Sequence, residues 1–124
     1  MSSVLVIDND EIIIELLRIS LTEMGLTPLL ATEVKTGEEL LHKHIDDIVL
    51  LVLDQVLPDM NGTEAYVRFR ESYPDLPVLF VSGFNAWDIA SKISSKHKCS
   101  FLQKPFNMID FKDAVKEAAN SMTS

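Results

Sequence analysis

Residues 48–62 read IVLLVLDQVLPDMNG, an unbroken aliphatic run that ends in an aspartate and a polar loop. A run of this length, bounded by polar and turn residues, is typical of a strand that is buried on both faces. Asp54 therefore lies at the end of a strand, at the rim of a sheet, where a lone carboxylate is costly to hold away from water. Such a carboxylate either is simply the first residue of the next loop, or it binds a cation or takes part in a reaction. The residues at the ends of the other strands help to decide between these two interpretations of Asp54.

Apolar patterns on both sides of this run predict an alternation of strands and helices. The expected strands are residues 4–7, 28–31, 48–53, 78–81 and 100–102. The expected helices run from Asp10, as N-cap, to Gly25, over residues 34–44, 62–72 and 87–95, and from Met108 to Met122. Five such β–α units predict an α/β fold: a doubly wound, five-stranded parallel sheet of flavodoxin-like type with strand order 2-1-3-4-5.

Length and composition restrict the class of protein. The chain has 124 residues, 47% of them hydrophobic, and we therefore expect a single domain over residues 1–124 with its core at about residues 3–120. The net charge of -8 argues against direct binding to nucleic acid. No long apolar run or signal pattern is present, so we expect a cytoplasmic protein without membrane attachment. The single Cys99 excludes an internal disulfide, and we expect it as a small buried residue that opens a strand.

Polar residues follow four of the five predicted strands. They are Asp8, Asn9 and Asp10, then Asp54, then Ser82 with Gly83, and finally Lys104 with Pro105. In open α/β sheets, ligands bind outside the carboxyl ends of the strands, at the point where the strand order reverses. We therefore expect one rim that holds carboxylates, a hydroxyl group and a lysine. Oxygen ligands with open positions for phosphate and water fit Mg2+ best.

Four segments in this order resemble the receiver domain of two-component response regulators, and the resemblance spans about residues 3–120. The segments are VLVIDNDE at 4–11, LDQVLPDMNG at 53–62, PVLFVSG at 77–83 and FLQKPF at 101–106. The resemblance implies that Asp54 accepts a phosphoryl group from a histidine of a sensor histidine kinase or a histidine phosphotransfer protein. It implies a signalling phospho-acceptor that promotes its own phosphotransfer and dephosphorylation, not an enzyme, and it allows a homodimer on phosphorylation.

The same resemblance implies a role for each residue of the rim. Mg2+ is held by the side chains of Asp8, Asn9 and Asp54 and by the backbone carbonyl of Val56. The phosphoryl oxygens are contacted by Ser82 and Lys104, the latter followed by a cis peptide bond to Pro105. Phe101 matches the switch aromatic of the family, although a core aromatic of a strand would give the same pattern.

One position departs from the pattern of the family. The second residue of its usual acidic pair is Asn9, whose amide oxygen can ligate Mg2+ but carries no charge. This change should weaken metal binding, and it leaves open a degenerate receiver that acts as a phosphorylation-independent protein-binding module. Asp10 is a helix cap in our interpretation rather than a substitute ligand. We favour an active receiver because the acceptor, the lysine, the hydroxyl group and the first acid are all present.

Other residue patterns and other families fit less well. We expect surface positions for His42, His44 and His97, and a solvated basic face for Lys92, Lys96 and Lys98. An enzyme of the haloacid dehalogenase type needs a second acid where this chain has Val56, and usually a cap domain. A flavodoxin-like FMN carrier needs a phosphate loop where residues 8–11 are mostly acidic. The sequence leaves open whether the chain is a stand-alone regulator, an excised domain or the terminal domain of a hybrid kinase.

Overall fold

The computed structural model of the chain describes residues 2–83 and 98–120. In chain order its elements are β1 (Ser3–Ile7), α1 (Glu11–Glu23), β2 (Thr27–Ala31), α2 (Val34–His44), β3 (Ile48–Asp54), α3 (Gly62–Ser72), β4 (Val78–Ser82), β5 (Cys99–Gln103) and α5 (Met108–Asn120). The helix expected over residues 87–95 lies outside the described residues, as do the end of the last helix, His97, Lys92 and Lys96.

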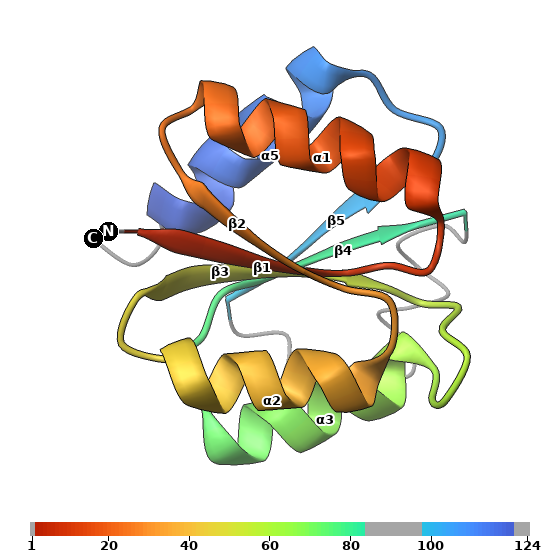
Figure 1. Ribbon diagram of the computed structural model, residues 1–124, viewed down its shortest axis with the longest axis vertical. Coiled ribbons are helices and arrows are strands. Elements are labelled where there is room, and N and C mark those ends of the chain that lie inside the picture. The colour runs from red at the N-terminus through yellow and green to blue at the C-terminus, as the bar shows by residue number, and fades with distance from the viewer. Residues whose placement is uncertain (1, 84–97, 121–124) are drawn as a thin grey trace.

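The five strands form one parallel sheet in the order β2-β1-β3-β4-β5, which confirms the predicted topology. Helices α1 and α5 cover one face of the sheet, and α2 and α3 cover the other (Figure 1). Because the chain moves outward in opposite directions from β1 and β3, the connections after these two strands diverge. The carboxyl ends of β1 and β3 therefore border the place where a doubly wound sheet binds its ligand.

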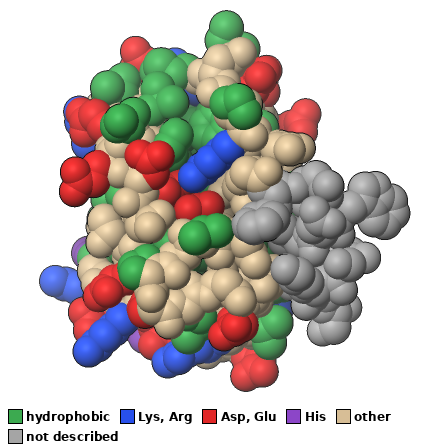
Figure 2. All heavy atoms as spheres, turned by 90° about the vertical axis from the view of Figure 1, so that its right-hand side faces the viewer, with side chains coloured by type: hydrophobic (Ala, Val, Ile, Leu, Met, Phe, Trp, Pro, Cys, Tyr) green, Lys and Arg blue, Asp and Glu red, His purple; other side chains and the backbone are tan. Residues whose placement is uncertain are grey.

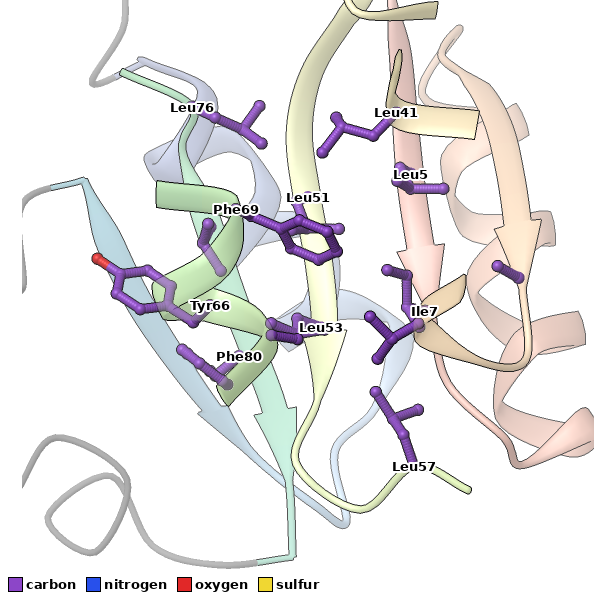
Figure 3. Close-up of a cluster of buried hydrophobic side chains, with 14 of the residues drawn as sticks. Leu5, Ile7, Leu41, Leu51, Leu53, Leu57, Tyr66, Phe69, Leu76 and Phe80 are labelled. Carbon is purple, nitrogen blue, oxygen red and sulfur yellow. The ribbon is translucent and has the colours of Figure 1, made fainter. Parts of the chain in front are cut away.

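The sheet separates two apolar cores. Alternate residues of β3 point to opposite faces, so Leu51 and Leu53 belong to the core under α2 and α3, and Leu50 and Val52 to the core under α1 and α5. Figure 3 shows the first of these cores, into which Leu57 packs from the loop after β3. Burial on both faces explains the unbroken aliphatic run of residues 48–53.

The predicted bounds of α2 and α3 are confirmed, and the ends of the other described elements differ from the predicted ends by at most two residues. The sheet ladders continue for as long as parallel partners are available, so β3 includes Asp54 and β4 includes Ser82. Both polar side chains are thus held by a strand backbone rather than by a loop. Cys99 opens β5 as predicted and packs against the core under α2 and α3, but it is only partly buried because β5 is an edge strand.

Helix ends follow the capping chemistry that the sequence predicts. The Asp10 side chain accepts hydrogen bonds from the backbone N–H of Ile12 at 2.9 Å and of Ile13 at 3.3 Å, which confirms it as the N-cap of α1. Gly25 follows α1 with a φ of 78°, in the left-handed region that glycine enters without a steric cost. No helix in the described ranges is long and apolar enough to cross a membrane.

The histidines that the structure describes lie on α2, away from the carboxyl ends of the strands. His42 is exposed and hydrogen-bonded to the hydroxyl group of Tyr73, and its ring centroid lies 5.6 Å from that of Tyr73. His44 is partly buried at the end of the helix. Over residues 2–83 and 98–120, no group of three His, Cys, Asp or Glu side chains could by itself hold a metal ion. Lys98, expected on a solvated face, is partly buried.

Candidate functional site

The predicted rim residues meet at the carboxyl ends of the strands. Asp8 follows β1, Asp54 ends β3, Ser82 ends β4 and Lys104 follows β5. Asp8 is 0% exposed, Asp54 5% and Ser82 2%, so three polar side chains are withdrawn from solvent at one end of the sheet. Figure 2 shows this end of the molecule, with basic and acidic side chains in contact near the middle of the face.

Lys104 connects the two buried carboxylates. Its Nζ donates a hydrogen bond to Asp8 Oδ2 at 2.9 Å and lies 3.6 Å from Asp54 Oδ1. The backbone N–H of Lys104 donates to the carbonyl of Ser82 at 2.7 Å, which ties the end of β5 to the end of β4. The Lys104–Pro105 peptide bond is cis, as the resemblance implied. The lysine that follows the edge strand therefore reaches across the rim to the strands at the switch point.

The loop after β1 orients Asp8. Its Oδ1 accepts a hydrogen bond from the backbone N–H of Asp10 at 2.9 Å, and its Oδ2 accepts the hydrogen bond from Lys104 Nζ. The backbone N–H of Asp8 donates to the carbonyl of Ala31 at 3.1 Å, so the loop stays aligned with the end of β2. Asn9 lies between the buried Asp8 and the capping Asp10, and it is exposed.

Asp54 is held in an environment that disfavours its charge. Burial and, next, the charge of Asp8 raise the pKa of the Asp54 carboxyl to about 6, although Lys104 and the backbone N–H of Gln55 act in the opposite direction. That N–H donates to Asp54 Oδ1 at 2.9 Å. Two buried carboxylates with one lysine between them carry an excess of negative charge, which a further cation would neutralise.

The ligand chemistry of the rim fits Mg2+. The carboxylates of Asp8 and Asp54, the amide oxygen of Asn9 and the backbone carbonyl of Val56 are all hard oxygen donors, the kind that Mg2+ prefers. Burial and, next, the charge of Asp8 raise the pKa of Asp54, and a cation bound between the two carboxylates would offset the second of these effects. A donor set made of these groups would supply two formal negative charges, because Asn9 is neutral.

Phe101, the candidate switch residue, packs as a core aromatic. It is partly buried on β5, and its ring is stacked on that of Phe80 with 5.7 Å between centroids and 9° between planes. The ring of Phe80 in turn packs against that of Tyr66 on α3, with 5.6 Å between the ring centroids. This conformation is the one expected for a strand aromatic, so the proposed switching role stays a prediction.

Sequence reasoning missed the contacts that support the loop between β3 and α3 (residues 55–61), which we call the acceptor loop because it follows the candidate acceptor Asp54. The backbone carbonyl of Gln55 accepts from Gly62 N at 2.8 Å, and its side-chain Oε1 accepts from Thr63 N at 2.9 Å. Asn61 Oδ1 accepts from Glu64 N at 2.9 Å, so the first three N–H groups of α3 all have partners. The Asn61–Glu64 spacing signals a cap, but nothing in the sequence points to Gln55.

Gly62 allows the acceptor loop to close against the end of β3. A Cβ atom at this position would lie 2.3 Å from the carbonyl oxygen of Asp54 and 2.9 Å from the Cα of Gln55. Both atoms belong to the backbone of the site and cannot move aside as a flexible side chain could. The glycine that ends the second motif thus permits α3 to begin directly against the residue that carries the candidate acceptor.

This geometry agrees with comparison to known proteins. The family described as the response regulator receiver domain matches residues 4–116. The chain belongs to this family. Receiver domains are signalling domains of two-component systems rather than classical enzymes, which confirms the predicted family and class.

Individual relatives support the same assignment. The chain is 31% identical over 109 residues to the DNA-binding transcriptional regulator NtrC of Rhizobium meliloti, an alignment that covers 88% of this chain and 22% of that protein. It is 30% identical over 114 residues to the response regulator protein PilR of Pseudomonas aeruginosa, covering 92% of this chain and 25% of that protein. The chain thus spans about a quarter or less of the length of these two relatives.

A solved structure gives the same result. The beryllofluoride-activated NtrC4 receiver domain dimer is 30% identical, with a TM-score of 0.86 and 98% of each chain covered. A receiver domain protein from Clostridium thermocellum has a TM-score of 0.88 at 21% identity, covering 99% of this chain and 98% of that one, and this likeness supports the fold alone.

Proposed function

We propose that this receiver domain accepts a phosphoryl group on Asp54 from a phosphohistidine, in a site that binds Mg2+, and that the transfer changes an interaction surface. The observation that carries the proposal is the pair of buried carboxylates bridged by Lys104, with Nζ at 2.9 Å from Asp8 and 3.6 Å from Asp54. A buried acid at a strand end has no structural need for a second buried acid beside it, whereas a phosphoryl site needs both an acceptor and a metal ligand.

In the proposed reaction a carboxylate oxygen of Asp54 forms a new bond to phosphorus while the bond between phosphorus and the imidazole nitrogen breaks. The imidazole leaves with the electron pair and takes up a proton. Bound Mg2+ supplies charge neutralisation between the acceptor and the anionic donor. Lys104 is already directed at Asp54 and provides positive charge for the phosphoryl oxygens. Ser82, two strands from β1, is the proposed hydroxyl donor to the same oxygens.

The proposed ligands of Mg2+ are Asp8, Asn9, Asp54 and the carbonyl of Val56. Asn9 follows the buried Asp8 directly, and Val56 follows Asp54 by two residues with its side chain exposed. The same arrangement would allow the domain to promote its own dephosphorylation, because the groups that neutralise the phosphoryl oxygens during transfer also neutralise them when water attacks the phosphorylated Asp54. The neutral amide of Asn9 sets the metal affinity lower than a third carboxylate would.

The phosphoryl donor that we propose is a sensor histidine kinase or a histidine phosphotransfer protein. Receiver domains interact with sensor kinases. The sensor kinase CckA of Brucella abortus is 32% identical over 71 residues, covering 57% of this chain and 8% of that protein. The activated NtrC4 receiver is a dimer, and we extend this to a homodimer of the phosphorylated form here.

Acetyl phosphate with Mg2+, followed by intact-mass measurement, tests the assignment. We expect one added phosphoryl group on the wild-type protein and none on Asp54→Asn, whose amide cannot form an acyl phosphate. Asp10→Asn is the matched control, because it makes the same chemical change beside the site and asparagine still caps a helix; it should be labelled normally. Circular dichroism checks that each variant is folded. Wild-type protein without added mass at any Mg2+ concentration would instead identify a phosphorylation-independent binding module.

A further inference from the structure

The acceptor loop has a third attachment point in its middle. Asp59 Oδ1 accepts a hydrogen bond from Val34 N at 2.9 Å, and Asp59 Oδ2 accepts one from Lys35 N at 3.0 Å. These donors are the first two N–H groups of α2. The two oxygens of one carboxylate therefore connect the loop that follows β3 to a helix that precedes β3 in the chain.

Helix α2 has no cap of its own to compete with this contact. Glu33 occupies the N-cap position with an extended backbone (φ -144°, ψ 161°), and its side chain makes no cap hydrogen bond. The first N–H groups of a helix need acceptors, and the helix dipole favours a negative charge at this end. Burial acts to raise the pKa of Asp59, but the N–H groups of Val34 and Lys35 outweigh it and hold the pKa below its ordinary value.

The attachment constrains the part of the loop that the proposed metal site uses. Val56 is preceded by Gln55, which is fixed to the start of α3, and followed by Leu57, whose side chain is buried in the core. Asp59 fixes the remaining end of this short segment to α2. A backbone carbonyl, unlike a side chain, is oriented only by the path of the chain on both sides of it.

We infer that Asp59 is a positioning residue, which fixes the acceptor loop on α2 and thereby holds the carbonyl of Val56 in place for the metal. The inference rests on the proposed function for the role of Val56. Asp59 itself contacts neither the phosphoryl group nor the metal. Its effect on the site passes through the backbone of residues 56–59, so it should alter metal binding beyond any effect on global stability.

Three variants separate loop position from helix stability and from charge. Asp59→Ala removes the attachment. Glu38→Gln is the matched control, because Glu38 lines the same surface hollow of about 330 Å³ and its loss also removes one negative charge and a link between α2 and α3, the ion pair with Arg68. The double variant Asp59→Ala/Glu33→Ser gives α2 a strong N-cap of its own, which restores the helix end without restoring the link to the loop.

Each protein is measured for Mg2+ affinity by calorimetry, for thermal midpoint, and for backbone mobility of the loop by amide relaxation of residues 56, 57, 59 and 60 without metal. We expect Asp59→Ala to weaken Mg2+ binding about tenfold, the lower end of the range for loss of an indirect support of a metal site, and to increase loop mobility. Glu38→Gln should change neither. The double variant should regain the thermal midpoint of the wild-type protein while its Mg2+ affinity stays low.

Two results would overturn the inference: recovery of full Mg2+ affinity in the double variant, or unchanged affinity and mobility in Asp59→Ala. If the wild-type protein binds no Mg2+, the metal assignment of the proposed function fails instead. The relaxation measurement then still decides whether Asp59 fixes the loop, since greater mobility in Asp59→Ala supports that part and unchanged mobility refutes it.

Discussion

The substitution Asp54→Asn should stabilise the metal-free protein at neutral and alkaline pH. Asp54 is 5% exposed, and burial together with the charge of Asp8 raises its pKa from 3.8 to about 6. The folded state therefore disfavours the ionised carboxylate that is present at pH 8. Asparagine has nearly the same shape and is neutral, and its Oδ1 can still accept the hydrogen bond that Gln55 N donates. The variant thus keeps the packing and removes the unfavourable charge.

The size of the stabilisation follows from the raised pKa of Asp54. A difference of roughly two pKa units between the folded and unfolded states corresponds to about 3 kcal/mol of unfolding free energy. The pKa of Asp54 is higher in the folded state than in the unfolded state. The stability that protonated Asp54 contributes is therefore fully present below pH 3.8 and is lost as the pH rises through about 6. We therefore expect the variant to be more stable by up to about 3 kcal/mol at pH 8, with this advantage disappearing toward pH 4.

The assay is urea denaturation of both proteins in a chelating buffer at pH 8, 6 and 4, with the difference in unfolding free energy as the measured quantity. All other titrating groups are shared, so their contributions cancel in that difference. Added Mg2+ should stabilise the wild-type protein and reduce the gap, because the cation supplies the missing positive charge. Equal stabilities at pH 8, or a difference that does not change with pH, would refute the claim that the folded state disfavours the ionised carboxylate of Asp54.

Three further substitutions test other parts of the site. Lys104→Met should lower the unfolding free energy at pH 7 by about 3 kcal/mol because it leaves the buried carboxylates uncompensated; a loss below about 1 kcal/mol in urea melts would contradict the bridging geometry. Asn9→Asp should tighten Mg2+ binding at least about fivefold by adding a charged ligand, and unchanged affinity in calorimetry would mean that Asn9 does not face the ion. Gly62→Ala should cost about 2 kcal/mol, because its Cβ would meet backbone at 2.3 Å. Gly37→Ala is the comparison: its Cβ would lie 2.3 Å from Cδ1 and 2.7 Å from Cγ1 of Ile7, and because a side chain can shift more readily than backbone, the change should cost less in thermal melts.

The parts of the fold that could be predicted from the sequence depend on short-range patterns. The aliphatic run of residues 48–53 identifies a strand buried on both faces, and five β–α units then restrict the topology to few choices. The rim residues could be predicted for the same reason, since carboxyl ends of parallel strands share one edge. Strand ends were less accurate, because Asp54 and Ser82 join their ladders through partners on neighbouring strands.

The supports of the site could not be predicted, because their partners are distant in the chain or non-specific in type. Asp59 accepts from N–H groups 25 and 24 residues earlier, and every residue except proline has such a donor. Gln55 is a buried amide directly after Asp54, where its sequence context suggests only an exposed loop. The stacking of Phe101 on Phe80 likewise depends on the register of β4 with β5.

The capping of two helices by one loop has a consequence for local unfolding. Gln55 and Asn61 complete the first turn of α3, and Asp59 completes that of α2, so the acceptor loop cannot detach without leaving backbone amides of both helices unsatisfied. The loop and the two helix ends therefore open together, as one cooperative unit in native-state hydrogen exchange. A protease that requires an extended, detached segment would meet in this loop a higher opening free energy than its surface position suggests.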